Sequence, residues 1–180
     1  MTRSVNELPE IIRPSSWVEH YCSHLPASGR VLDLACGSGR HARLLAGQNL
    51  AILAVDRNSE ALSTLAGVPG IETACLDLEG DDWPLAGQHF AGIVVTNYLW
   101  RPRLPDALAM LAPGGVLIYE TFMLGNAAYG KPSNPDFLLA PGELREIAAA
   151  AGLHEIAFAE GYAEMPKPCM RQAIVAIRPI

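Results

Sequence analysis

The stretch that decides the fold is Val31-Leu32-Asp33-Leu34-Ala35-Cys36-Gly37-Ser38-Gly39-Arg40. A short apolar run enters a turn with two glycines, and residues 41–46 follow with helical spacing. Glycine lets the backbone come close to a ligand, and the first turn of the next helix offers free N–H groups. In a doubly wound sheet, the turn after the first strand is also where ligands bind. The stretch therefore predicts a strand–turn–helix unit with a binding site at its turn.

Six further apolar segments follow this unit, and stretches of helical spacing separate most of them. These predicted strands are residues 51–56, 71–76, 91–96, 115–122, 154–159 and 171–178. Near-continuous apolar runs that alternate with helices are typical of a parallel sheet covered on both faces. The last two runs have no helix between them, and their link, residues 160–170, contains two prolines and is expected to be a loop. The sequence therefore predicts an α/β fold, a seven-stranded, mostly parallel sheet with a reversed last strand and helices on both faces.

The remaining segments predict helices and one long loop. Helices are expected over residues 41–46, 59–65 and 104–111, from Pro141 to Gly152, and from Pro14-Ser15-Ser16-Trp17 onward with a serine cap. The first helix is expected across the mouth of the sheet or along its edge. Residues 123–140 form the longest stretch without such signals and leave the fifth strand at its carboxyl end, where open α/β sheets bind ligands. Its glycines, prolines and few apolar anchors predict a functional loop that opens at low cost.

The composition predicts one domain that spans residues 1–180. Half of the residues are hydrophobic and 18% are charged, which argues against a disordered or coiled-coil chain. No apolar run reaches the roughly 18 residues of a membrane helix, and Glu7 and Glu10 stand where a signal peptide would be apolar. We therefore expect a cytoplasmic protein with no membrane partner. The net charge of -6 argues against nucleic acid as the main partner.

The cysteines and histidines predict neither a disulfide scaffold nor a metal site. The four cysteines, at positions 22, 36, 75 and 169, lack the spacing of a zinc ribbon and are expected to be reduced thiols. His20 and His24 are four residues apart with Cys22 between them, but no third ligand is evident, so an amphipathic helix is favoured. Cys36, in the glycine turn, is interpreted as a small packing residue.

Two further acids stand at the ends of predicted strands. Asp56 ends the second strand, and Asp77 ends the third. A carboxylate after the second strand can accept both hydroxyls of a ribose, and Asp77 can accept an exocyclic amine such as that of adenine. Each acid alone is more often a turn former, but with Asp33 and the glycine turn the two acids favour a nucleoside site. Gly39 is followed by Ala42 where a dinucleotide fingerprint has a third glycine, so a ligand without a pyrophosphate is favoured.

Over nearly its whole length the chain resembles the class I S-adenosylmethionine-dependent methyltransferases, a family with a Rossmann-like sheet of seven strands. Residues 33–39 match its first motif, Ala54-Val55-Asp56 the second, Asp77-Leu78 the third, and residues 111–115 the turn before the fifth strand. Gly39-Arg40-His41 and residues 134–144 are similar to the small tellurite-resistance-type members.

The resemblance implies S-adenosylmethionine as the cofactor. The implied cofactor-binding residues are Asp33, Gly37, Gly39, Asp56, Arg57, Asp77, Leu78, Asn97 and Tyr98. Asp33 would meet the amino group, Asp56 the ribose and Asp77 the adenine, while Asn97-Tyr98-Leu99 would lie beneath the sulfonium. Arg57 departs from the family, in which this residue is often apolar and packs on adenine; its guanidinium would stack there or point to solvent.

The expected reaction is methyl transfer to a small-molecule acceptor, such as a thiol or a chalcogen nucleophile, because the chain leaves no room for a separate recognition domain. Such a nucleophile needs little or no base, and the sequence identifies no catalytic residue. The candidate substrate residues are Tyr98, Trp100, Tyr129 and Cys169. Thr96-Asn97-Tyr98-Leu99 lacks the Pro-Pro pair of enzymes that methylate base amines.

Four more residues near the expected pocket have open interpretations. Arg101 and Arg103 flank Pro102, and they either form a solvated turn or hold an anionic acceptor. Tyr119 and Glu120 end the fifth strand, and either could serve as a base, but neither has an evident partner.

Three other functions stay open. A nicotinamide oxidoreductase would be expected to have the third glycine of the dinucleotide fingerprint. A non-catalytic protein would bind S-adenosylmethionine without turnover. A methyltransferase acting on RNA or protein would need a partner, and binding to RNA should weaken steeply with salt.

Overall fold

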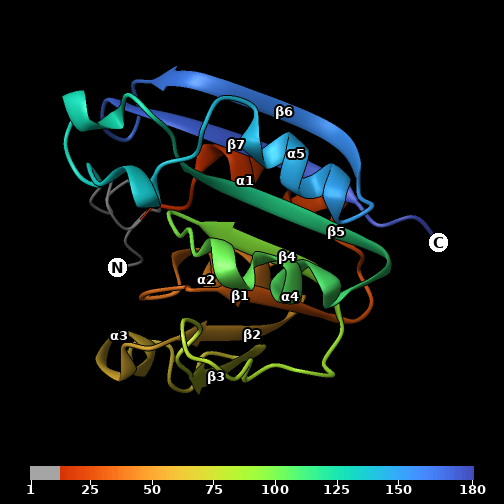
Figure 1. The fold of residues 1–180 in the computed structure, drawn as a ribbon. Coiled ribbons are helices and arrows are strands. Elements are labelled where there is room, and N and C mark those ends of the chain that lie inside the picture. The colour runs from red at the N-terminus through yellow and green to blue at the C-terminus, as the bar shows by residue number, and fades with distance from the viewer. Residues whose placement is uncertain (1–12) are drawn as a thin grey trace.

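Seven strands form one sheet in the order β3-β2-β1-β4-β5-β7-β6 (Figure 1). The computed structural model describes residues 13–180, so Glu7 and Glu10 lie outside the described residues. The strands are β1 (Arg30–Leu34), β2 (Ala51–Asp56), β3 (Ile71–Cys75), β4 (Phe90–Thr96), β5 (Leu111–Phe122), β6 (His154–Ala163) and β7 (Cys169–Ile177). β1 to β5 pair in parallel, and β7 is antiparallel to both β5 and β6. The predicted Rossmann-like sheet with its reversed last strand is confirmed.

The central strands are mostly apolar because their side chains alternate between two cores. On β1, Leu32 belongs to one core and Val31 to the other, and on β2 the same holds for Leu53 and Ile52. Successive side chains of a strand point to opposite faces, so both faces of this sheet must be covered.

Helices cover both faces (Figure 1). α1 (Ser16–Tyr21), α2 (Arg40–Ala46) and α3 (Ser59–Ser63) contribute to the core that contains Val31. α4 (Leu104–Ala109) and α5 (Glu143–Ala150) contribute to the core that contains Leu32. Among residues 13–180, no helix has the length and apolar character needed to cross a membrane.

α1 packs against a face of the sheet, so its predicted place across the mouth or along the edge is wrong. Val18 is fully buried in the same core as Val31, Val94 and Val116. The sheet face offers this helix far more apolar contact than the polar strand ends at the mouth. The predicted cap is confirmed, because the Ser15 hydroxyl accepts a hydrogen bond from the first-turn backbone.

The final hairpin is longer than predicted. Residue pairing continues from Glu160↔Gln172 to Ala163↔Cys169, which leaves residues 164–168 as the turn. The predicted loop over residues 160–170 is therefore wrong at both ends. Both prolines lie within the short turn, and a proline excludes regular pairing only locally.

Two other boundaries shift by a few residues. β5 begins at Leu111, which pairs with Phe90 before a bulge, so the helix predicted to reach residue 111 ends earlier. α5 begins after Gly142, so Pro141 precedes the helix and does not occupy its first turn. Gly152, with φ +71°, follows the end of α5 as predicted.

Residues 123–140 are packed more firmly than predicted. They include two short 3₁₀ helices, Asn126–Ala128 and Pro135–Phe137. Met123, Leu138 and Leu139 are buried, and an isolated bridge joins Met123 to Leu139. The expectation of few apolar anchors is wrong, because apolar side chains at both ends of the segment are buried in the core.

Candidate functional site

A pocket lies at the carboxyl ends of β1, β2 and β3, beside the residues that follow β4. It is lined by Ala35, Asp56, Arg57, Leu76, Asp77, Leu78, Glu79 and Tyr98. The sequence had assigned five of these to the cofactor and missed Ala35, Leu76 and Glu79. Each missed residue lies within or directly beside a matched motif, which was the available signal. Parallel strands bring the motifs together because their carboxyl ends meet at one edge of the sheet.

Asp56, at the end of β2, holds the glycine turn that follows β1. Its Oδ2 accepts a hydrogen bond from the Gly37 N–H at 2.7 Å, and its Oδ1 accepts one from the Asn58 N–H at 2.9 Å. The half-buried carboxylate therefore ties two neighbouring turns together. Each oxygen retains acceptor capacity for a further donor, so this structural role is compatible with ligand binding.

The glycine turn needs its two glycines for different reasons. Gly37 and Gly39 have φ of +56° and +74°, in the left-handed region that favours glycine. A Cβ on Gly39 would lie 2.4 Å from Leu65 Cδ1, whereas a Cβ on Gly37 would meet nothing within 4 Å. Gly39 is therefore required for packing as well as for conformation, and Gly37 leaves open space beside the turn.

Asp77 and Arg57 lie on the more exposed side of the pocket. Asp77 Oδ1 accepts a hydrogen bond from the Glu79 N–H at 2.9 Å. The Arg57 side chain is 71% exposed, and its Nη1 lies 3.4 Å from Glu79 Oε2. An ion pair this exposed contributes little to stability. Arg57 is thus a solvated residue of the pocket rim in this structure.

Asp33, in β1, is a buried carboxyl group beside the start of α2. Its Oδ2 accepts a hydrogen bond from the Ala42 N–H at 2.9 Å, and its Oδ1 has no partner among the described residues. Burial raises the pKa of Asp33 to about 7, against the opposing effects of that hydrogen bond and of Arg40. A buried acceptor without a partner is unusual and calls for water, a proton or a ligand.

His41 is a buried residue that the sequence identified only as part of a helix. Its Nε2 accepts a hydrogen bond from the Ser15 N–H at 3.0 Å, and its Nδ1 lies 3.3 Å from Thr96 Oγ1. Because Nε2 accepts, we assign the ring proton to Nδ1, which donates to Thr96. Burial, together with smaller effects of Arg40 and Arg171, lowers the pKa of His41 to about 3. The neutral ring ties the start of α1 to the end of β4, and no sequence signal pointed to this.

Asn97, Glu120 and Arg171 form a second polar cluster, contributed by the ends of β4, β5 and β7. Arg171 Nη1 donates to Glu120 Oε2 at 3.0 Å, and Nη2 donates to Asn97 Oδ1 at 2.8 Å. Glu120 is 2% exposed, and neither Glu120 Oε1 nor Arg171 Nε has a partner among the described residues. The expectation that Glu120 lacks a partner is wrong. β7 pairs Ala173 with Glu120, which places Arg171 two residues away on the same face.

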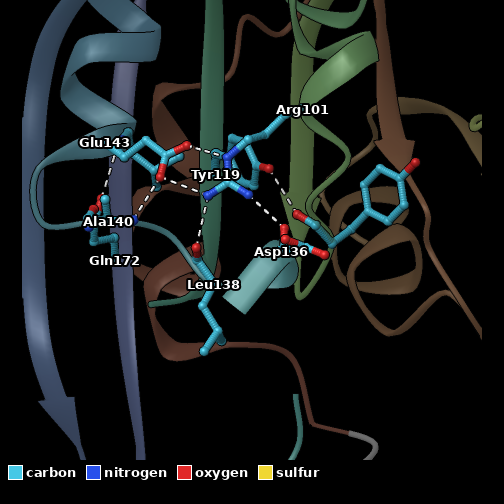
Figure 2. A network of polar contacts seen from close by, with 9 residues as sticks. Arg101, Tyr119, Asp136, Leu138, Ala140, Glu143 and Gln172 are labelled. Atoms are coloured by element: carbon cyan, nitrogen blue, oxygen red, sulfur yellow. Dashed lines mark hydrogen bonds and ion pairs between the residues drawn. The ribbon is translucent and has the colours of Figure 1, made fainter. Parts of the chain in front are cut away.

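A third network is centred on Arg101 (Figure 2). Its Nε and Nη2 donate to Glu143 Oε1 and Oε2 at 2.6 and 2.9 Å. Its Nη1 and Nη2 also donate to the carbonyls of Asp136 and Leu138 at 2.6 and 2.8 Å. We call Arg101, Glu143 and the backbone of residues 136–140 the Arg101 clamp. The sequence of residues 134–144 is similar to the tellurite-resistance-type members. In the structure, Glu143 and the backbone of residues 136–140 in this segment belong to the Arg101 clamp.

The structure corrects the predictions for Arg103 and Tyr119 as well. Arg103 Nε and Nη2 both donate to the Gly80 carbonyl, and its Nη1 pairs with Asp106 at 3.1 Å. Both guanidinium groups are thus bound within the fold and are not free to hold an anionic acceptor, although the Arg101 side chain is 39% exposed. Tyr119 is fully buried, and its hydroxyl donates to the Tyr98 carbonyl at 2.8 Å, which makes it a poor candidate base.

Of the four predicted substrate residues, only Tyr98 lines the pocket. Its hydroxyl is buried without a partner among the described residues, and burial raises the pKa of the phenol above its usual range. Trp100 is half-buried, and Tyr129 is exposed against Tyr162, with ring centroids 5.4 Å apart. Cys169 is buried at the start of β7, so it is not an accessible thiol.

His20 and His24 both lie beside Tyr21, and both are exposed. The ring centroids of His20 and Tyr21 are 4.6 Å apart, and those of Tyr21 and His24 are 5.5 Å apart. Within residues 13–180, no three His, Cys, Asp or Glu side chains are grouped as metal ligands.

A family model described as a methyltransferase domain matches residues 31–115. This segment runs from β1 into β5 and contains the glycine turn and every residue that lines the pocket. No curated protein matches the sequence.

Several solved structures share the fold. TehB from Haemophilus influenzae superposes with a TM-score of 0.72 at 20% identity, covering 90% of this chain and 61% of that one. A SAM-dependent methyltransferase from Archaeoglobus fulgidus gives 0.71 at 14% identity, covering 89% and 91%. The glycopeptide N-methyltransferase MtfA, complexed with S-adenosylhomocysteine, gives 0.64 at 18% identity, covering 91% and 88%. This chain therefore spans about three fifths of the TehB chain.

These likenesses establish the fold, and the segment that matches the methyltransferase domain contains the whole lining of the pocket. The strand order, with β7 inserted between β5 and β6, is that of the same family. The chain therefore has the fold of SAM-dependent methyltransferases, and its residues 31–115 match a methyltransferase domain.

Proposed function

We propose that the chain transfers a methyl group from S-adenosylmethionine to a small-molecule acceptor. The observation that supports this most directly is the pocket, which combines the acids Asp56 and Asp77 with the flat or apolar side chains of Tyr98, Leu76 and Ala35. An adenosine group offers ribose hydroxyls and an exocyclic amine as donors, together with a flat ring. The pocket lining matches both properties, as ligand sites usually do.

At the adenosine end, Asp56 is proposed to accept the ribose hydroxyls. Asp77 and the Leu78 N–H are proposed to contact the adenine edge, and Arg57 to lie along the rim. This assignment agrees with the exposure of Asp77 and Arg57 at the more open side of the pocket.

At the methionine end, the unpartnered Oδ1 of Asp33 is proposed to accept the amino group, directly or through water. Gly37 and Gly39 let the backbone pass beside this part of the ligand. Asn97, which has φ of +55° directly after β4, is proposed to lie beneath the sulfonium.

The acceptor is proposed to approach the cluster of Asn97, Glu120 and Arg171. Arg40, directly after the glycine turn, interacts electrostatically with Glu120 and Arg171, so the cluster lies toward the methionine end. The bound cofactor supplies an activated methyl group, so the protein is needed mainly to align the acceptor and exclude water. The proposal assigns no catalytic base.

The relatives support the cofactor more than the acceptor. MtfA is named for a glycopeptide and was solved with S-adenosylhomocysteine, so the shared fold leaves the acceptor to the residues of each chain. A cytoplasmic location is part of the proposal, and the four unpaired cysteines support it.

Calorimetric titration with S-adenosylmethionine, S-adenosylhomocysteine and NAD tests the cofactor. We expect the first two to bind, and binding of NAD alone would contradict the proposal. Incubation with methyl-labelled cofactor and thiols, chalcogen oxyanions, carboxylates and RNA then tests the acceptor. Cofactor binding without transfer would support a non-catalytic binding protein, and transfer to RNA would support a nucleic-acid methyltransferase.

A further inference from the structure

We propose that Arg101 is a positioning residue for the cofactor pocket. The Arg101 clamp holds residues 136–140 against the connection that follows β4. It thereby sets the position of Tyr98 and the affinity of the pocket for the cofactor. This inference rests on the proposed function, because Tyr98 is taken to contact the cofactor.

The first observation is that Arg101 binds backbone as well as a carboxylate. Two of its four hydrogen bonds go to Glu143, and two go to the carbonyls of Asp136 and Leu138. Arg145 and Glu155 form an ion pair of similar geometry, with Nε and Nη2 at 2.7 and 2.9 Å from the two carboxylate oxygens. Glu143 and Arg145 both belong to α5. The pairs differ in their further contacts, since Arg101 also binds two loop carbonyls, whereas the Arg145 guanidinium lies over the Phe158 ring, 4.0 Å from its centroid.

The second observation is that Ala140 is held from two sides. Its N–H donates to Glu143 Oε2 at 2.7 Å, and its carbonyl accepts from Gln172 Nε2 at 2.5 Å. Gln172 is fully buried in β7, and its Oε1 accepts from the Leu144 N–H at 3.0 Å. Figure 2 shows these contacts converging from the loop, α5 and β7. Residues 136–140 therefore cannot shift without breaking several hydrogen bonds together.

The third observation links the clamp to the pocket. Arg101 follows Tyr98 by three residues, and Tyr98 lines the pocket. The Tyr98 carbonyl accepts the hydrogen bond from buried Tyr119, which fixes the start of this short connection. Arg101 fixes its other end, so loss of the clamp frees the connection on one side only.

The charges of the clamp persist through the neutral range. The hydrogen bond to Arg101 lowers the pKa of Glu143, against the opposing effect of partial burial. The same hydrogen bond raises the pKa of Arg101. Both partners therefore stay charged near neutral pH, and the ion pair persists there. This contrasts with the easily opened loop that the sequence predicted.

The test compares Arg101→Gln, Arg101→Lys and Glu143→Gln with the matched control Arg145→Gln. S-adenosylhomocysteine affinity is measured by calorimetry well below each melting temperature, and limited proteolysis is mapped over residues 123–142. We expect Arg101→Gln and Glu143→Gln to weaken S-adenosylhomocysteine binding about tenfold, or about 1.4 kcal/mol, and to speed cleavage in that segment. Arg101→Lys should not restore affinity, because one ammonium group cannot replace the planar fork that binds Glu143 and two carbonyls.

Arg145→Gln should bind S-adenosylhomocysteine within about twofold of the wild type. A double variant, Arg101→Gln with Glu143→Gln, should bind S-adenosylhomocysteine no more weakly than the more damaging single variant. Each single change already disrupts the same clamp, so the two effects should not add. If Arg101→Gln matches Arg145→Gln in affinity while its loop is cleaved faster, the clamp is only structural and the inference is overturned. Failure of the wild type to bind would instead contradict the proposed function.

Discussion

The side of the site proposed for the cofactor and the side proposed for the acceptor are built differently. On the cofactor side, Asp33, Asp56 and Asp77 end or approach the ends of neighbouring parallel strands and bind backbone N–H groups of nearby turns. On the side proposed for the acceptor, side chains bind one another across the sheet, as Arg171 binds Glu120 51 positions away and Asn97 74 positions away. The cofactor side therefore follows from strand order along the chain, whereas the acceptor side depends on which strands are paired.

The two sides also differ in how far their charged side chains are exposed to water. Asp77 and Arg57 on the cofactor side are exposed, while Glu120 on the acceptor side is buried against Arg171. Removing one member of a buried pair leaves an uncompensated charge, but removing an exposed charge does not. Substitution of one member of the buried Glu120–Arg171 pair should therefore mainly change stability, and substitution of the exposed charges on the cofactor side should mainly change affinity for the cofactor.

The largest expected effect is that of Arg171→Met. It leaves the Glu120 carboxylate buried without its partner and should lower the free energy of unfolding by about 3–5 kcal/mol. Urea denaturation measures this. The double variant Glu120→Gln with Arg171→Met should recover most of the loss, because no buried charge remains. A single-variant loss below about 1 kcal/mol would show that the acceptor side is as solvated as the cofactor side.

Asp56→Ala should weaken S-adenosylmethionine binding by one to two powers of ten, since each charge-assisted hydrogen bond contributes roughly 1.5–3 kcal/mol. The bonds to Gly37 and Asn58 add a loss of stability, as expected of an acid that also forms a turn. Asp56→Asn should be milder in both respects because it keeps one acceptor. Calorimetric titration and a thermal melt on the same variants separate the two effects. Unchanged affinity in a folded Asp56→Ala would refute the ribose assignment.

Gly39→Ala and Gly37→Ala form a matched pair within the glycine turn. Both residues have positive φ, but only at Gly39 would the new Cβ collide with Leu65. We expect Gly39→Ala to lose about 2 kcal/mol of unfolding free energy and Gly37→Ala about 1 kcal/mol. Chemical denaturation compares them. Equal losses would mean that Leu65 moves aside at little cost.

The last expected effect is a dependence of stability on pH that Asp33 causes. Its native pKa of about 7 lies above its ordinary value of 3.8, so between these values the native state holds a proton that the unfolded chain releases. This contribution to stability is full below about pH 4 and is lost as the pH rises to about 7.

Asp33→Asn removes this titration. The wild type should therefore lose stability relative to Asp33→Asn from pH 5 to pH 7, by at most about 1.4 kcal/mol per pH unit. Other groups, including His41, titrate in both proteins, so the difference isolates Asp33. Parallel pH profiles from thermal melts would show that Asp33 is ionised throughout.

Much of the fold and most of the cofactor pocket were predictable from local patterns. The apolar runs from β1 to β5 predicted strands because a strand that is buried on both faces has apolar side chains at nearly every position. Asp56 and Asp77 were found because they end such strands. His41, next to the matched motif, was missed because the Ser15 and Thr96 groups that it joins are far away in the sequence.

The sequence by itself determined the alternation of strands and helices, the glycine turn and the acids of the pocket. Each of these depends on backbone conformation or on the order of neighbouring parallel strands, which short segments encode. Tertiary structure decided that α1 covers a sheet face, that Glu120 pairs with Arg171 and that Arg101 holds residues 136–140. Those contacts join segments whose relative register is set only when the whole sheet forms, with β7 inserted beside β5.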